Sequence, residues 1–223
     1  KNYNGIILNL AELRLYYYMP PSDLYEGTRV LTYPVGIGRL DWKTPLGETF
    51  IRYKVKNPDW YPPKSIIKEH EDDGEILPRV VKSGPNNPLG AYALKLNVDG
   101  GYLLHGTNKK YGIGMKVSHG CIRLRNEDIK TIFHNVSIGT KVKIVDLPIK
   151  IGTYKNFLYM EVHAFNNQEV YSNNQINFLT TNNIYKPVKP VMNFLDANPD
   201  YKVNWKNVFK AYKESNGIPV IIG

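Results

Sequence analysis

Short stretches of strand-forming residues alternate with polar turns along the first quarter of the chain. Residues 5–18 are rich in Ile, Leu and Tyr, and a polar break at 9–12 divides them into two short predicted strands. The pattern returns at 28–37 and 48–55, and the glycine- and proline-containing segment 38–47 between them indicates a loop. Because these four predicted strands follow one another with no helical periodicity between them, the pattern predicts an antiparallel β architecture.

A strong hairpin signal, Asp-Gly-Gly at 99–101, separates two further predicted strands at 92–98 and 102–105. His105 is therefore expected at the end of a strand. Another strand is predicted at 140–145, and we expect it to close the main domain.

A short helix is predicted between the strands that end near 105 and begin near 140. Asn126 is expected to cap its start, and the two acidic residues that follow suit the positive N-terminal end of a helix. Ile129, Ile132 and Phe133 recur at helical spacing, so one face of this helix is expected to pack on the core.

Residues 57–87 differ from their surroundings because they are rich in proline, show almost no periodicity and carry an acidic patch at 69–75. Loops longer than about 15 residues in compact domains are usually functional lids or linkers. The position of this segment between strands of one domain favours a lid. The acidic patch could attract an amine, although a solvated loop face is the simpler interpretation.

The composition shifts towards Asn, Tyr and Lys after Pro148. A strand is predicted at 157–164, followed by an Asn-rich middle, a helix at 204–215 and a final strand at 218–222. The helix carries an apolar stripe, which indicates packing rather than a partner site; the stripe consists of Trp205, Val208, Phe209 and Tyr212.

These patterns predict a main domain over residues 1–147, containing the lid-like loop, and a small α+β appendage over residues 148–223. No run approaches the roughly 18 apolar residues that a membrane-spanning helix needs, so no transmembrane segment is expected. The first residue is Lys1 rather than methionine, and we expect a processed or trimmed chain.

The chain is basic, with 29 Lys and Arg against 20 Asp and Glu and a formal charge of +9. Such a charge favours acidic partners. Nucleic acid is one candidate, but the basic residues are scattered and no nucleic-acid motif appears, so no nucleic-acid partner is expected. A polyanionic wall polymer fits the charge as well. The histidines and the cysteine show no metal-ligand spacing and no phosphate or dinucleotide loop appears, so no metal and no cofactor are expected.

Residues 102–125 contain the only cysteine and two of the five histidines. Cys121 follows Ser118-His119-Gly120, and His105 lies upstream, which is typical of a thiol nucleophile with its base. The alternative is an inert, buried cysteine unrelated to either histidine. A single cysteine cannot form an intrachain disulfide, which leaves its thiol available for chemistry.

The sequence suggests roles for three residues around the thiol. Gly120 permits unusual backbone angles, so the N–H groups of Gly120 and Cys121 can form an oxyanion hole; the alternative is an ordinary turn glycine. Arg123 lies two residues past the thiol and shares its face on an extended segment, where a guanidinium can bind a substrate carboxylate; the alternative is an exposed arginine with no such role. Ser118 is either a substrate contact or a turn hydroxyl.

His-Gly-Thr at 105–107 and Ser-His-Gly-Cys-Ile-Arg-Leu at 118–124 resemble the active-site signature of L,D-transpeptidases of the YkuD/ErfK type. The resemblance points to the Gram-negative ErfK/YbiS-like branch and extends to NPDWYPP, GPNNPLGAYAL, VSHGCIRLRNEDI and GIPV. It implies a mainly β fold, the antiparallel β-sandwich of the YkuD-like catalytic domain, with one or two short helices. Many members of that branch begin with a signal peptide and a glycan-binding LysM module, and neither is visible here.

The resemblance also implies roles for the site residues. His105 would be the base that partners Cys121, and the backbone carbonyl of Gly106 would hold its tautomer. His119 would be a structural or substrate-binding group rather than the base. The segment 57–87 would lie beside the active site.

The function implied is a peptidoglycan L,D-transpeptidase in the periplasm or cell envelope, which acts on stem peptides and is a target of carbapenems. Its cysteine would take the acyl group from a tetrapeptide stem, release the terminal D-Ala, and pass the acyl group to a diamino-acid amine or to a lysine of an envelope protein. The alternatives are an L,D-carboxypeptidase, for which water is the acceptor, and a wall-binding module without catalysis.

Overall fold

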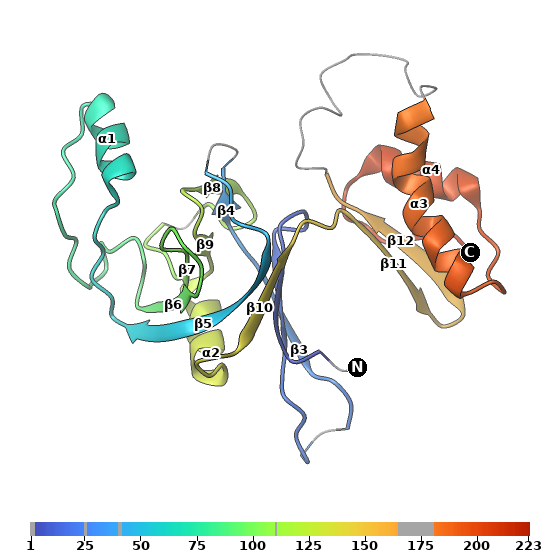
Figure 1. Ribbon diagram of the computed structural model, residues 1–223, viewed down its shortest axis with the longest axis horizontal. Helices are drawn as coiled ribbons and strands as arrows, with labels where there is room; N and C mark the ends of the chain where they lie inside the picture. Colours follow the sequence, from blue (N-terminus) through green and yellow to red (C-terminus); the bar gives the residue numbers. More distant parts are fainter. Residues whose placement is uncertain (1–2, 25, 40–41, 110, 165–180) are drawn as a thin grey trace. The chain divides into compact units, whose positions relative to one another are not determined.

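The structure, a computed structural model, describes residues 3–24, 26–39, 42–109, 111–164 and 181–223, with side chains from 188 onwards in the last of these ranges. The chain divides into two compact units, Lys1–Val145 and Asp146–Gly223 (Figure 1).

The first unit is built on one mixed sheet. Within the described residues it has eight strands in the order β3-β2-β1-β10-β5-β6-β7-β9. The strands β4 and β8 form a separate two-stranded sheet. The strands are β1 (Gly5–Asn9), β2 (Arg14–Tyr18), β3 (Val30–Pro34), β4 (Ile37–Gly38), β5 (Gly47–Lys56), β6 (Tyr92–Leu96), β7 (Leu103–His105), β8 (Lys116–Ser118), β9 (Ile122–Arg123) and β10 (Lys141–Val145). The mainly β fold class predicted from the sequence is confirmed.

Most neighbouring strands pair antiparallel, as the turn signals predict, but two pairs in this sheet are parallel. β1 pairs with β10, and β7 pairs with β9. A parallel pair needs a long connection between its strands. The segment that links β7 to β9 is such a connection, and it carries the Ser-His-Gly-Cys sequence.

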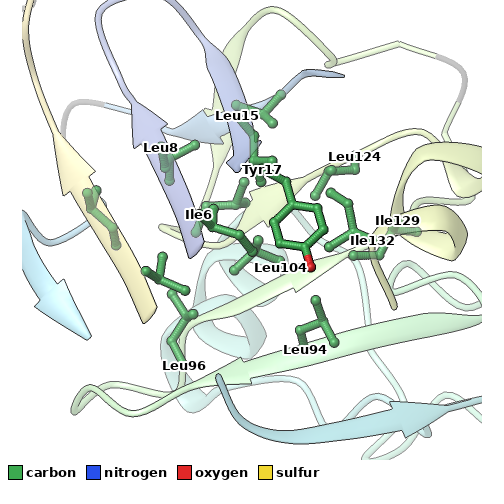
Figure 2. Packing of buried hydrophobic residues seen from close by; sticks show 14 of the residues in the cluster. Ile6, Leu8, Leu15, Tyr17, Leu94, Leu96, Leu104, Leu124, Ile129 and Ile132 are labelled. Carbon is green, nitrogen blue, oxygen red and sulfur yellow. The ribbon is translucent and has the colours of Figure 1, made fainter. Parts of the chain in front are cut away.

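The core of the first unit follows the alternation of the strands. In β2, Leu15 and Tyr17 are buried while their chain neighbours are not. The helix α2 (Asn126–Asn135) covers this core with Ile129 and Ile132, both fully buried (Figure 2). Burying one such side chain contributes about 1.5–3 kcal/mol. The Tyr17 hydroxyl donates a hydrogen bond to the backbone oxygen of Asn135 at 2.9 Å, so the buried ring keeps a polar partner.

Asn126 does not cap α2, contrary to the prediction. Arg125 occupies the cap position, with no side-chain cap bond, and Asn126 is the first helical residue. Its side chain reaches the loop after β7 instead: the Asn126 amide oxygen accepts from the Thr107 N–H, and the amide nitrogen donates to the Thr107 carbonyl, both at 2.9 Å. The asparagine at the start of α2 therefore anchors the loop after β7 and does not cap the helix.

The segment 57–87 is not structureless, because it contains the helix α1 (Lys64–Asp72). A bridge between Trp60 and Val81 closes its base. The fully buried side chain of Asn87 holds the two ends together, since its amide donates to the carbonyls of Pro58 and Val81 at 2.9 and 3.0 Å. The excursion is thus a closed, anchored unit with a short helix at its far end (Figure 1).

The second unit is a small α+β structure with a core of its own. Its sheet is the antiparallel series β11 (Ile149–Tyr154), β12 (Phe157–Val162) and β13 (Val220–Ile221), and α3 (Thr181–Ala197) and α4 (Trp205–Glu214) contact it. Val208 of the predicted stripe is buried in this core, whereas Trp205 is 36% exposed. The predicted Asn-rich middle, 165–180, lies outside the described residues. Among the described helices, none is long and apolar enough to cross a bilayer.

Candidate active site

The parallel pairing of β7 with β9 brings the two halves of the predicted site together. Leu104 pairs with Ile122 and His105 with Arg123. The same register sets Cys121 beside Leu103, whose backbone hydrogen-bonds the cysteine. Leu104 and Ile122 are fully buried in the core, and side chains alternate across a strand, so His105, Cys121 and Arg123 share the opposite face.

His105 is held in one tautomer. Its ring is 4% exposed, and Nδ1 lies 2.6 Å from the Gly106 carbonyl oxygen, which accepts only if Nδ1 carries the proton. The other nitrogen, Nε2, is then the basic one. Burial lowers the pKa of His105 to about 4; the Gly106 hydrogen bond opposes this shift and the Arg123 charge adds to it. The imidazole is therefore neutral at pH 7 and able to accept a proton.

The thiol of Cys121 is also neutral at rest. Burial raises its pKa, while the hydrogen bond from the Leu103 backbone and the charges of Lys95 and Arg123 lower it. The resting pair is accordingly a thiol and an imidazole rather than an ion pair. Formation of the thiolate then requires transfer of its proton to a nearby base.

Gly120 adopts a conformation that favours glycine. Its φ is +98°, and a Cβ at this position would lie 2.6 Å from Cε1 of Tyr102. The Thr44 hydroxyl donates to the Gly120 carbonyl at 2.9 Å. Because the C=O and N–H of a trans peptide point in opposite directions, this bond directs the Cys121 N–H away from Thr44. In the described part of the chain, that N–H donates no hydrogen bond to another protein group.

Ser118 is buried and bonded on both sides. Its hydroxyl donates to the Cys121 carbonyl at 2.5 Å and accepts from the Gly120 N–H at 3.2 Å. Only 1% of the Ser118 surface is exposed, so this geometry favours the role of a turn hydroxyl over that of a substrate contact. It also occupies the Gly120 N–H, so the Cys121 N–H is the better placed of the two predicted oxyanion donors.

His119 points towards the lid-like segment rather than towards the base position. Its Nε2 lies 2.5 Å from Oε2 of Glu69 on α1, and Arg39 binds the other oxygen of the same carboxylate. The edge of the Trp42 ring contacts the imidazole, with 5.3 Å between ring centroids. The hydrogen bonds from His119 and Arg39 lower the pKa of Glu69. A helix in the 57–87 segment is therefore bonded to the residue two before the candidate nucleophile.

A known protein family matches most of the first unit. The YkuD family model, the L,D-transpeptidase catalytic domain, matches residues 3–144. The chain belongs to this L,D-transpeptidase family. The resemblance predicted from the sequence is thereby confirmed.

Individual relatives are similar to this chain over most of its length. The probable L,D-transpeptidase ErfK/SrfK of Escherichia coli strain K12 is 39% identical over 98% of the chain and 66% of its own length. The probable L,D-transpeptidase YcfS of the same strain is 44% identical over 83% of the chain and 58% of its own length. A crystal structure of a mutant Enterococcus faecium L,D-transpeptidase is 20% identical in sequence, with a TM-score of 0.47. The match covers 63% of this chain and 49% of the chain in that crystal structure. The chain thus spans between half and two thirds of the curated relatives named here.

Arg123 lies beside Cys121, and its backbone is held on both sides. Besides pairing with β7, its N–H donates to the Gly36 carbonyl at 2.8 Å and its carbonyl accepts from the Gly36 N–H at 2.9 Å. Burial lowers the pKa of the guanidinium and Cys121 opposes this shift. Within the described residues, no carboxylate forms an ion pair with it. A substrate carboxylate is the kind of partner that such a guanidinium accepts.

Sequence reasoning missed four residues of the candidate site. Glu69 was visible only as part of an acidic run, and Asn126 only as a helix cap. Thr44 lies in a predicted loop and Lys95 in a predicted strand, and neither carried a local signal. Each acts through a contact between segments far apart in the chain, which only the fold can reveal.

Proposed function

We propose that this protein is a cysteine L,D-transpeptidase that acts on peptidoglycan stem peptides. The single observation that supports it most is the β7–β9 register, which sets Cys121 and His105 on one sheet face while the Gly106 carbonyl fixes the proton on Nδ1. An imidazole with a basic nitrogen on the same sheet face as a half-buried thiol is the minimum that nucleophilic acyl transfer requires.

In the proposed first step, Nε2 of His105 takes the thiol proton and Sγ of Cys121 attacks the carbonyl that joins the L-centre of the diamino acid to a terminal D-Ala. The Cys121 N–H donates to the developing oxyanion. The C–N bond then breaks, the departing amine of D-Ala takes the proton from His105, and a thioester remains on Cys121. Arg123 binds a carboxylate of the donor peptide in this scheme.

In the second step, an amine attacks the thioester, His105 accepts the amine proton, and the thiolate leaves. The proton then returns to sulfur. An amine from another stem gives a 3-3 cross-link, and a lysine of an envelope protein gives anchoring. Water as the acceptor would make the protein an L,D-carboxypeptidase, and a wall-binding module would show no turnover at all.

The division of labour proposed for the chain follows its two units. The first unit would be the catalytic domain, and the second an appended subdomain. The ErfK-like relatives support a place in the periplasm or cell envelope, where the stems are found. The basic charge of +9 suits a polyanionic wall polymer.

The test is incubation of the protein with tetrapeptide stems and an acceptor amine, followed by mass analysis of the products. We expect a cross-linked product and free D-Ala, and we expect Cys121→Ala to lower turnover at least about a thousandfold while the thermal unfolding transition stays in place. His105→Ala is expected to be nearly as severe. A carbapenem is expected to give a one-to-one adduct with the wild-type protein and none with Cys121→Ala. Turnover by Cys121→Ala near the wild-type rate would contradict the mechanism.

A further inference from the structure

Lys95 stands on the same sheet face as the candidate nucleophile. It belongs to β6 and pairs with Leu103 of β7, and the backbone of Leu103 in turn hydrogen-bonds Cys121. Directly paired residues on neighbouring strands point to one side of a sheet. Lys95, Leu103 and Cys121 therefore form one row across three strands, while Leu94 and Leu96 on either side of Lys95 are fully buried on the other face.

The Lys95 amine lies over the turn between β6 and β7. A Cβ added to Gly101, whose φ is +81°, would lie 3.4 Å from Nζ, which is ordinary van der Waals contact and places the amine next to this turn. Lys95 is half-buried, and within the described residues no carboxylate forms an ion pair with it. An ammonium withdrawn from water without a counter-ion is costly, and such groups occur mostly where their charge is used.

Two cations act on Cys121 from different strands. They are Arg123 on β9 and Lys95 on β6, and Arg52 on β5 acts in turn on Lys95, while the neutral His105 adds no charge. Burial lowers the pKa of Lys95, the Cys121 thiolate opposes this shift and the Arg52 charge adds to it. Burial raises the pKa of Cys121, and the Lys95 charge is among the groups that oppose that rise.

The reaction proposed above has a specific need for such a charge. When the proton moves from Sγ of Cys121 to Nε2 of His105, a thiolate and an imidazolium form in a site whose burial disfavours both. Arg123 is committed to a substrate carboxylate in that scheme. We propose that Lys95 is a positioning residue whose ammonium stabilises the Cys121 thiolate; this inference rests on the roles proposed for Cys121 and His105.

The test measures the thiol directly, without substrate, through the pH dependence of its alkylation by iodoacetamide. Lys95→Met is expected to raise the midpoint of the alkylation profile by about one pH unit. Lys95→Arg, which keeps the charge, is expected to restore it. Lys56→Met is the matched control. It removes an exposed lysine from β5 at a position that pairs with Tyr92 of β6 and not with Lys95. This control is expected to leave the midpoint unchanged.

Lys95→Gln serves as a second neutral variant if the methionine variant does not fold. An unchanged midpoint in a folded neutral variant would overturn the proposal, even if turnover falls, because Lys95 would then act on the substrate. A raised midpoint that Lys95→Arg fails to restore would also overturn it. If the midpoint moves as expected but the wild-type protein turns over no stem peptide, the thiolate role stands and the proposed function fails.

Discussion

At the scale of single residues, the site depends on groups kept in their neutral forms by burial. His105 is the clearest case, since its pKa falls from 6.5 to about 4. In the unfolded chain the same imidazole binds a proton below about pH 6.5. The unfolded state therefore gains protons first as the pH falls, and the folded state loses stability between about pH 6.5 and pH 4.

This difference gives a pH prediction. A shift of this size corresponds to about 3 kcal/mol, which is present above pH 6.5 and lost by pH 4. We expect His105→Gln to remove that part of the pH dependence. On acidification the free energy of unfolding should therefore fall more for the wild-type protein than for the variant. Urea unfolding at pH 7 and pH 4.5 measures it. A wild-type-minus-variant difference that is the same at both pH values would contradict the burial of a neutral imidazole.

Gly120 supports a second prediction at this scale. An alanine there meets both an unfavourable φ of +98° and the ring of Tyr102, whose Cε1 would lie 2.6 Å from the new Cβ. Gly139 is a matched control, since its φ is +86° and nothing lies within 4 Å of a Cβ. We expect Gly139→Ala to cost about 1 kcal/mol and Gly120→Ala about 2–3 kcal/mol, with loss of thiol alkylation only in the latter.

Thermal and urea unfolding of the two glycine variants give the comparison. Tyr102→Ala in the Gly120→Ala background is expected to recover part of the stability, because it removes the clash and leaves the strain. Equal costs at the two glycines would show that the Tyr102 contact is unimportant.

At the scale of elements, the predictable part of the structure is the part that local pattern controls. The hairpin between β6 and β7 follows from Asp-Gly-Gly, and the buried face of α2 follows from the spacing of its isoleucines. The parallel pairing of β7 with β9 does not follow, because alternation identifies a strand but not its partner. The motif residues could therefore be identified from the sequence. Their position on one face of the sheet depends on the pairing of β7 with β9, which the sequence does not predict.

The helix α1 shows why an element can escape sequence reasoning. Pro63 occupies its cap position without a side-chain bond, its first turn has no acidic residue, and only Ile66 is buried. None of the usual start signals is present. What holds the helix is tertiary: the Glu69 carboxylate binds His119 and Arg39, which lie outside the segment.

This contact makes α1 a candidate for a lid over the site, and a lid predicts a change of products rather than a simple loss of activity. A transpeptidase must keep water from the thioester, because water competes with the amine. Replacing residues 64–77 by a short linker, with the Trp60–Val81 bridge retained, is expected to lower the ratio of cross-linked or anchored product to free tripeptide. The ratio is measured at fixed acceptor concentration.

Glu69→Gln is the matched point variant for that deletion. It keeps the helix and weakens only its bonds to His119 and Arg39, so we expect the same direction of change with a smaller size. An unchanged ratio in a folded, active deletion variant would show that α1 does not exclude water.

At the scale of the whole molecule, the two units have separate cores. The apolar cluster of the first unit runs from Ile6 to Ile144, and that of the second from Leu158 to Ile222, with no residue in common among those described. The last strand of the first unit, β10, lies between β1 and β5 and ends at Val145. The first unit is thus closed before the second begins.

A protein truncated after Val145 is therefore expected to fold by itself. It keeps its complete sheet, α2 and every residue proposed to act at Cys121, and at this length a single domain can bury a sufficient core. We expect one cooperative thermal transition and a carbapenem adduct on Cys121, formed at a rate within about threefold of the full chain, because the acylating groups all belong to the first unit. Circular dichroism and intact-mass spectra measure the two properties. Cys121→Ala in the truncated protein is the control for the adduct. A truncated protein that folds but forms no adduct would show that the second unit contributes to the reacting site, and one that does not fold would show that the two cores depend on each other.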